Sequence, residues 1–94
     1  MKSVLQTRKE CFICGAQTNL HDHHIIYGVA NRKKSEKYGL KCFLCYEHHE
    51  GNTGVHHNPN KSYDLYLKQT AQEYYEEHYG SREDFIREFG KSFL

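Results

Sequence analysis

The feature that most constrains the fold is the clustering of residue types that bind metals. The chain of 94 residues has four cysteines and eight histidines, and all of them except His78 lie between residues 11 and 57. A chain this short buries too little surface for its hydrophobic core alone to give more than marginal stability. Clustered thiol and imidazole groups therefore predict one domain, residues 1–94, that bound metal helps to hold together.

The spacing of the cysteines is typical of a zinc knuckle. Cys11 and Cys14 are separated by two residues, so that one tight turn, which the following Gly15 permits, supplies two ligands. A tetrahedral site needs a second pair. Two registers fit equally well, Cys42 with Cys45 or Cys45 with His48, and the spacing alone does not choose between them.

The sequence contains no segment typical of membrane proteins or secreted proteins. No apolar run approaches the roughly 18 residues that a spanning helix needs, and the first six residues lack the apolar stretch of a signal peptide. We therefore expect a soluble, cytoplasmic protein without membrane partners. In a reducing compartment, paired cysteines indicate metal thiolates rather than disulfides.

Either zinc register leaves histidines that the zinc does not need. A domain with so small a core cannot satisfy all of them as buried residues, so some are exposed or bind a second metal. The doublets His23-His24 and His48-His49, beside the cysteine pairs, are the strongest candidates for function. The remaining histidines of this region are His21, His56 and His57.

The near-zero net charge hides an asymmetry along the chain. Residues 1–45 contain eight Lys and Arg against three Asp and Glu, whereas residues 46–94 contain five against nine. Clustered cations neutralise phosphates and release counterions, so the basic half indicates a polyanionic partner. The densest basic segment, which we expect to contact nucleic acid, contains Arg32, Lys33, Lys34 and Lys37.

The pattern of apolar and turn residues predicts a small α+β fold. We expect a strand over residues 20–27, a short helix that Gly39 ends, a second strand over 40–44 and a helix or turn over 45–50. Residues 62–94 are predicted to form helical C-terminal scaffold. There the segment from Ser81 to Asp84 resembles a capping box at the start of the last helix.

Three segments together resemble a known family. They are Cys11-x-x-Cys14, then Leu20-His21-Asp22-His23-His24-Ile25, then Leu44-Cys45-Tyr46-Glu47-His48-His49. Residues 11–58 resemble the HNH (His-Asn-His, ββα-metal) endonucleases, especially short phage and prophage members. The resemblance implies a ββα-metal core, in which a β-hairpin and a helix grip a catalytic divalent ion and a zinc knuckle braces the hairpin.

The family pattern also implies a role for each matching residue. In a doublet before a hydrophobic residue the first member binds the catalytic metal and the second is the general base, which makes His23 a ligand and His24 the base. The later segment implies a structural zinc on Cys11, Cys14, Cys45 and His48, with Cys42 as a spare thiol. His49 is then a second ligand of the catalytic ion and His56 a third.

Two points depart from the family pattern. The family's middle Asn has no counterpart directly before the second strand, and the candidate nearby is Asn31, within the basic segment. Adjacent residues of a regular strand also face opposite ways, so His23 and His24 converge only where the strand is bulged or ending. Asp22 as an oxygen ligand, with His23 as the base, is the alternative.

The resemblance implies a metal-dependent endonuclease that cuts phosphodiester bonds of nucleic acid, with DNA as the expected substrate. Its cofactors are expected to be a structural Zn²⁺ and a catalytic Mg²⁺, Mn²⁺, Ni²⁺ or Zn²⁺, and its setting a phage or prophage protein in a bacterial host. The alternative from another class is a non-catalytic, zinc-stapled adaptor that binds nucleic acid or protein. The oligomeric state is left open.

Overall fold

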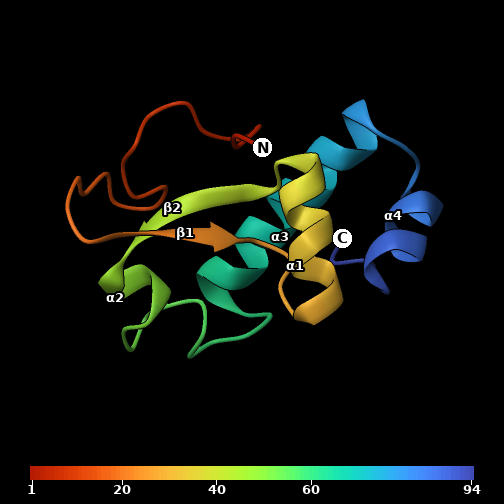
Figure 1. Cartoon of the computed structure of the whole chain (residues 1–94). Coiled ribbons are helices and arrows are strands. Elements are labelled where there is room, and N and C mark those ends of the chain that lie inside the picture. The colour runs from red at the N-terminus through yellow and green to blue at the C-terminus, as the bar shows by residue number, and fades with distance from the viewer.

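The computed structural model describes residues 1–94, which form a small α+β structure with one two-stranded sheet and four helices (Figure 1). No helix of the chain is both long enough and apolar enough to cross a membrane. The elements follow one another as β1 (Leu20–His24), α1 (Val29–Tyr38), β2 (Lys41–Cys45), α2 (Tyr46–His49), α3 (Ser62–His78) and α4 (Arg82–Phe89).

The two strands are antiparallel, and α1 lies in the connection between them. Leu20 pairs with Cys45 at one end of the sheet, which we call the knuckle end because Cys45 is a predicted zinc ligand. His24 pairs with Lys41 at the other end, next to α1. Strand β1 is shorter than predicted, because the backbone N–H and carbonyl of Ile26 bond to the Ser35 hydroxyl on α1 instead of to β2. Gly39 ends α1 in the left-handed conformation, with φ of 71°, as predicted for a glycine at a helix end.

Residues 3–6 run along the free edge of β2 (Figure 1). The backbone N–H of Val4 donates to the carbonyl of Gly39, and the N–H of Phe43 donates to Oε1 of Gln6. The first bond satisfies a carbonyl at the end of α1, and the second satisfies an N–H of the edge strand β2 that would otherwise face solvent. The amino-terminal segment is therefore part of the fold that holds β2 in place.

Helix α3 runs behind the two strands and α4 packs beside it (Figure 1). The predicted capping box at α4 is present: the hydroxyl of Ser81 accepts from the N–H of Asp84, and the Asp84 carboxylate accepts from the N–H of Ser81. The core joins these helices to the sheet through Cys11, Ile25, Ile26, Leu40, Cys42, Leu44, Val55, Leu67, Ala71, Tyr75, Phe85 and Phe89.

Candidate metal centres

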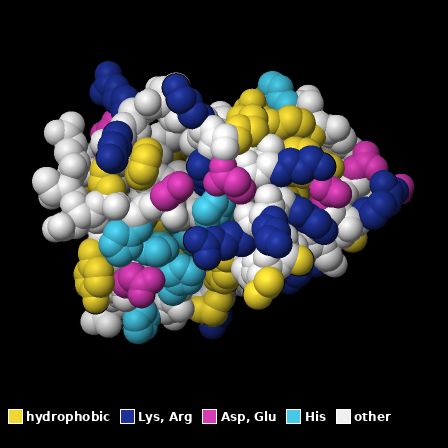
Figure 2. All heavy atoms as spheres, in the orientation of Figure 1, with side chains coloured by type: hydrophobic (Ala, Val, Ile, Leu, Met, Phe, Trp, Pro, Cys, Tyr) yellow, Lys and Arg dark blue, Asp and Glu magenta, His cyan; other side chains and the backbone are white.

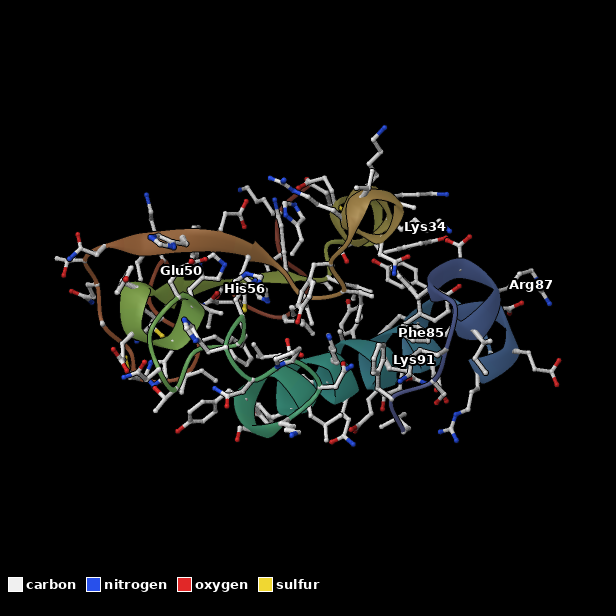
Figure 3. All side chains as sticks on the ribbon, turned by 90° about the horizontal axis from the view of Figure 1, so that it is seen from below. Lys34, Glu50, His56, Phe85, Arg87 and Lys91 are labelled. Atoms are coloured by element: carbon white, nitrogen blue, oxygen red, sulfur yellow. The ribbon has the colours of Figure 1, made fainter.

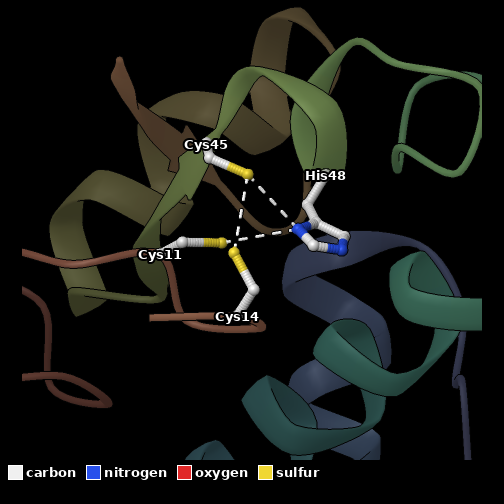
Figure 4. Close-up of side chains that lie close together, drawn as sticks. All are labelled: Cys11, Cys14, Cys45 and His48. Carbon is white, nitrogen blue, oxygen red and sulfur yellow. Dashed lines mark hydrogen bonds between the residues drawn. The ribbon is translucent and has the colours of Figure 1, made fainter. Parts of the chain in front are cut away.

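Four predicted zinc ligands lie together at the knuckle end of the sheet (Figure 4). The Sγ atom of Cys45 lies 3.8 Å from Sγ of Cys14 and 3.3 Å from Nδ1 of His48, and Sγ of Cys11 lies 3.7 Å from the same Nδ1. In a tetrahedral zinc site with Zn–S bonds of about 2.3 Å, neighbouring sulfur atoms lie about 3.8 Å apart. The four residues could therefore hold a structural metal such as zinc.

Local structure places these ligands in two pairs. Gly15 takes a left-handed conformation, with φ of 79°, and its N–H donates to the carbonyl of Cys11, which closes the turn that carries Cys11 and Cys14. Cys45 is the last residue of β2, and His48 follows one turn later in α2. Although burial opposes it, hydrogen bonding to the backbone of Cys45, Cys14 and Ile13 lowers the pKa of Cys11 to about 6, which favours a thiolate.

Cys42 lies outside this cluster, although its spacing from Cys45 equals that of the other pair. Its side chain is buried in the core, 1% exposed, and burial raises the pKa of its thiol. An inert, protonated thiol is a small hydrophobic side chain rather than a ligand. Of the two registers that the spacing left open, the structure brings together the one with His48.

A second cluster joins three histidines from different segments. Nε2 of His49 lies 3.0 Å from Nε2 of His56. The centre of the His23 ring lies 5.1 Å from the centre of the His49 ring and 5.3 Å from that of the His56 ring. His23 belongs to β1, His49 ends α2, and His56 follows on the loop between α2 and α3 (Figure 3). The N–H of His56 donates to the carbonyl of His49, which holds this loop against α2.

The electrostatics of this cluster keep its inner histidines neutral. Burial, reinforced by His49 and His56, lowers the pKa of His23 to about 3, and burial likewise lowers the pKa of His49 to about 4. His23 is 2% exposed, and its Nε2 atom is buried without a hydrogen-bond partner. Because an orphaned buried nitrogen is costly and a neutral imidazole offers a lone pair, the three histidines are suited to bind a cation.

His21 was not assigned a role by the sequence, yet it contacts this cluster. Its Nδ1 atom lies 2.6 Å from Nδ1 of His49, so one of the two nitrogens carries a hydrogen and the other accepts it. When His49 offers Nε2 to a cation, its Nδ1–H is the donor and His21 orients the ring. The alternation along β1 gave the only sequence signal for this contact, since it places His21 on the same side as His23.

Asp22 and His24 lie on the opposite side of β1, as the alternation predicts. Nε2 of His24 lies 2.8 Å from Oε1 of Glu36 on α1, and Nζ of Lys41 lies 3.0 Å from the same oxygen and 3.4 Å from Oδ2 of Asp22. Asp22 is thus grouped with His24 and Glu36, not with the three histidines.

Both sides of β1 nevertheless open into one hollow of about 440 Å³. The strand ends at His24, so the backbone no longer separates the two sets of side chains. The walls include the three clustered histidines together with Asp22, His24 and Arg32. A neighbouring hollow of about 540 Å³ shares His24 and Arg32 and adds Lys33 and Glu36.

The structure does not place Asn31 at this hollow. Its Nδ2 atom donates to the carbonyl of Phe89 at 3.4 Å, at the contact between α1 and α4. Neighbouring residues of a helix point about 100° apart, so a helix that directs Arg32 to the hollow directs Asn31 away from it. Asn31 therefore contacts α4 rather than the hollow, and the orienting role expected from the family pattern stays a prediction.

The side chains of the basic segment point in different directions, as those of Asn31 and Arg32 do. Arg32, Lys33 and Lys37 are exposed on α1, and Lys and Arg side chains there adjoin the histidines gathered over β1 and α2 (Figure 2). Lys34 instead lies between α1 and α4, where its Nζ donates to the carbonyl of Glu88 near the end of α4 (Figure 3). Its ammonium group therefore complements a helix C-terminus and is not free in the structure.

No family model, curated protein or solved structure matches this chain in the three comparisons with known proteins.

Proposed function

We propose that this chain is an HNH-type, metal-dependent endonuclease that hydrolyses phosphodiester bonds of nucleic acid, with DNA as the substrate. The observation that carries the proposal is the hollow at the end of β1, which His24 shares with the cluster of His23, His49 and His56. A zinc-stapled adaptor needs only the first cluster, whereas the second adds neutral imidazoles beside a separate histidine and an exposed arginine.

The two clusters suit different roles for a metal. Cys11, Cys14, Cys45 and His48 supply four ligands, which is the closed set of a structural zinc site. The second cluster supplies three nitrogen ligands, and catalytic sites keep a position open beside three protein ligands. A divalent ion held there would stabilise charge that develops on the phosphate and on the leaving oxygen.

The residues around the hollow supply the other parts of a hydrolysis. A neutral imidazole is a competent general base, so His24 would take a proton from the attacking water. Arg32, at the wall of the hollow, would hold a phosphate of the backbone, and Lys33 and Lys37 would contact phosphates farther along. Such contacts give affinity with little sequence specificity.

The test is a plasmid-nicking assay of the zinc-loaded chain with Mg²⁺, Mn²⁺ or Ni²⁺. Wild type is compared with His24→Ala and with His57→Ala, whose exposed histidine lies outside both clusters. We expect His24→Ala to cut at least about a hundredfold more slowly, the effect of losing a general base, while metal and DNA binding persist. His57→Ala should cut as wild type does.

Two results would change the proposal. If wild type cuts neither DNA nor RNA with any of these ions, or if His24→Ala cuts as fast as wild type, the adaptor function is the better account. All-imidazole coordination suits Mn²⁺, Ni²⁺ or Zn²⁺ better than Mg²⁺. Strong activity with Mg²⁺ alone would therefore make Asp22 a ligand and His23 the base.

A further inference from the structure

Glu36 is the one carboxylate of the chain that contacts the candidate base. Its Oε1 atom lies 2.8 Å from Nε2 of His24, and this is the only hydrogen bond of the imidazole. Asp22 also lies nearby but contacts Lys41 rather than His24. Neither the charge pattern nor the family resemblance gave Glu36 a role, since it stands in a segment rich in lysine.

The fold places Glu36 against His24 through its neighbour Ser35. The buried hydroxyl of Ser35 donates to the carbonyl of Ile26 at 2.7 Å and accepts from the N–H of Ile26 at 3.2 Å. These two bonds fix the middle of α1 against the chain that leaves β1. Because His24 is the last residue of β1 and Glu36 follows Ser35, the same anchor sets the distance between imidazole and carboxylate.

The groups around Glu36 keep it ionised. The amino terminus of Met1, then His24 and then Lys41 hold the pKa of the Glu36 carboxyl well below its usual range. An ionised carboxylate only accepts hydrogen bonds, so the hydrogen of this contact belongs to Nε2 of His24. The neutral ring then carries its lone pair on Nδ1, which has no hydrogen-bond partner.

We propose that Glu36 is a positioning residue that holds His24 in the Nε2–H tautomer, with Nδ1 as its basic nitrogen. This inference rests on the proposed function, in which Nδ1 takes a proton from water. The water O–H bond breaks, its proton goes to Nδ1, and the electron pair left on the water oxygen forms the new bond to phosphorus. The bond from phosphorus to the leaving sugar oxygen breaks, and that oxygen keeps the bonding pair and takes a proton from solvent. Glu36 then faces an imidazolium cation, which its negative charge stabilises.

The first test measures the tautomer and needs no enzymatic activity. Long-range ¹H–¹⁵N NMR spectra of the zinc-loaded full chain at pH 8 distinguish the two neutral tautomers of an imidazole, and His24→Ala identifies the signals. We expect Nε2–H in wild type and a mixture of tautomers in Glu36→Ala. Lys41→Met is the matched control, because Nζ of Lys41 bonds to Glu36 and makes no hydrogen bond to the His24 ring, and its His24 signals should match those of wild type.

The second test is kinetic and uses the same variants. Glu36→Ala should lower kcat by about tenfold to a hundredfold, the range for a hydrogen bond to a charged group, with KM and metal affinity unchanged. Glu36→Gln keeps an accepting oxygen but not the charge, so it should keep the tautomer and lose part of the rate. It also serves as the measured variant if Glu36→Ala fails to fold.

The outcomes separate this inference from the nuclease proposal. An identical His24 tautomer in wild type and Glu36→Ala, or equal cleavage by the two, overturns the role of Glu36 even if wild type is an active nuclease. If wild type cuts nothing but the tautomer responds to Glu36→Ala as expected, the nuclease proposal fails while the Glu36–His24 relationship stands.

Discussion

Nζ of Lys68 lies 2.8 Å from Oδ2 of Asp64, one turn away on α3, and both side chains are buried. The same Oδ2 accepts from the hydroxyl of Tyr27 at 3.3 Å, and Nζ of Lys68 lies 4.2 Å from the centre of the Tyr27 ring. The centre of the Tyr27 ring lies 5.8 Å from the centre of the His23 ring and 5.1 Å from that of the His56 ring. Helix α3 thus supports the histidine cluster through Tyr27.

This buried ion pair should be essential for stability. Lys68→Met leaves the buried Asp64 carboxyl without its counter-charge, and removing one partner of a buried pair costs roughly 3–5 kcal/mol. The double variant Asp64→Leu with Lys68→Met removes both charges and should lose less than the single variant. Chemical denaturation measures the free energy of unfolding in each case.

The control for this prediction is the pair between Arg82 and Glu76, which is more exposed. Arg82→Ala should cost less than about 1 kcal/mol, as is usual for surface ion pairs. A loss in Lys68→Met no larger than that in Arg82→Ala would contradict the support role of the buried pair.

Two matched cysteine variants test the zinc site. Cys14→Ser should lose both bound zinc and the fold, because structural zinc supplies on the order of 10 kcal/mol of folding free energy in small domains. Cys42→Ser should keep one equivalent of zinc and lose at most a few kcal/mol, since it only buries a hydroxyl, at about 1–3 kcal/mol. Zinc analysis and circular dichroism of the two proteins, with His48→Ala beside them, check the register. If His48→Ala retained zinc and Cys42→Ser lost it, Cys42 rather than His48 would be the fourth ligand.

The neighbours His56 and His57 test the second cluster. The zinc-loaded chain is titrated with Ni²⁺ or Mn²⁺ in a calorimeter. His56→Ala should bind the ion at least about tenfold more weakly than wild type, since even residues that contact a metal only through its ligands contribute that much affinity. His57→Ala should bind as wild type does, because His57 lies outside the cluster. Equal affinities in the two variants would remove His56 from the ligand set.

The acid sensitivity of the fold should depend on His23. Burial, with His49 and His56, lowers the pKa of His23 from 6.5 to about 3, so the unfolded chain takes up a proton below about pH 6.5 that the folded chain does not. The stability that a neutral, buried His23 contributes is therefore fully present above about pH 6.5 and is lost as the pH falls toward about 3. From pH 7 to pH 5, wild type should lose about 2 kcal/mol more than His23→Leu. The free energy of unfolding is measured by denaturation at one equivalent of zinc. If the two proteins lose the same free energy between pH 7 and pH 5, His23 is not held neutral by the fold.

Salt dependence tests which basic side chains contact DNA. Replacing Lys33 and Lys37 with alanine should flatten the slope of log affinity against log salt by about two, one for each lost phosphate contact. Lys34→Ala should change the slope less and the stability more, because its Nζ is bound to the carbonyl of Glu88. An unchanged slope in the double variant would place the nucleic-acid contact elsewhere.

The sequence by itself determined the features that depend on neighbouring residues. Two-residue spacing was enough to pair Cys11 with Cys14, and the alternation of a strand was enough to put His23 and His24 on opposite sides of β1. The capping box at Ser81 was also readable, because its hydrogen bonds join residues three apart. In each case the backbone geometry of one element fixes the contact.

Only the tertiary structure decided the contacts between elements. Cys42 and His48 were equivalent by spacing, and the path of β2 into the core separated them by burying Cys42. The contacts of Lys34 with Glu88 and of Asn31 with Phe89 depend on where α4 packs, and that of His24 with Glu36 depends on the anchor between Ser35 and Ile26. Such contacts follow from how loops return the chain to itself, which local residue patterns do not encode.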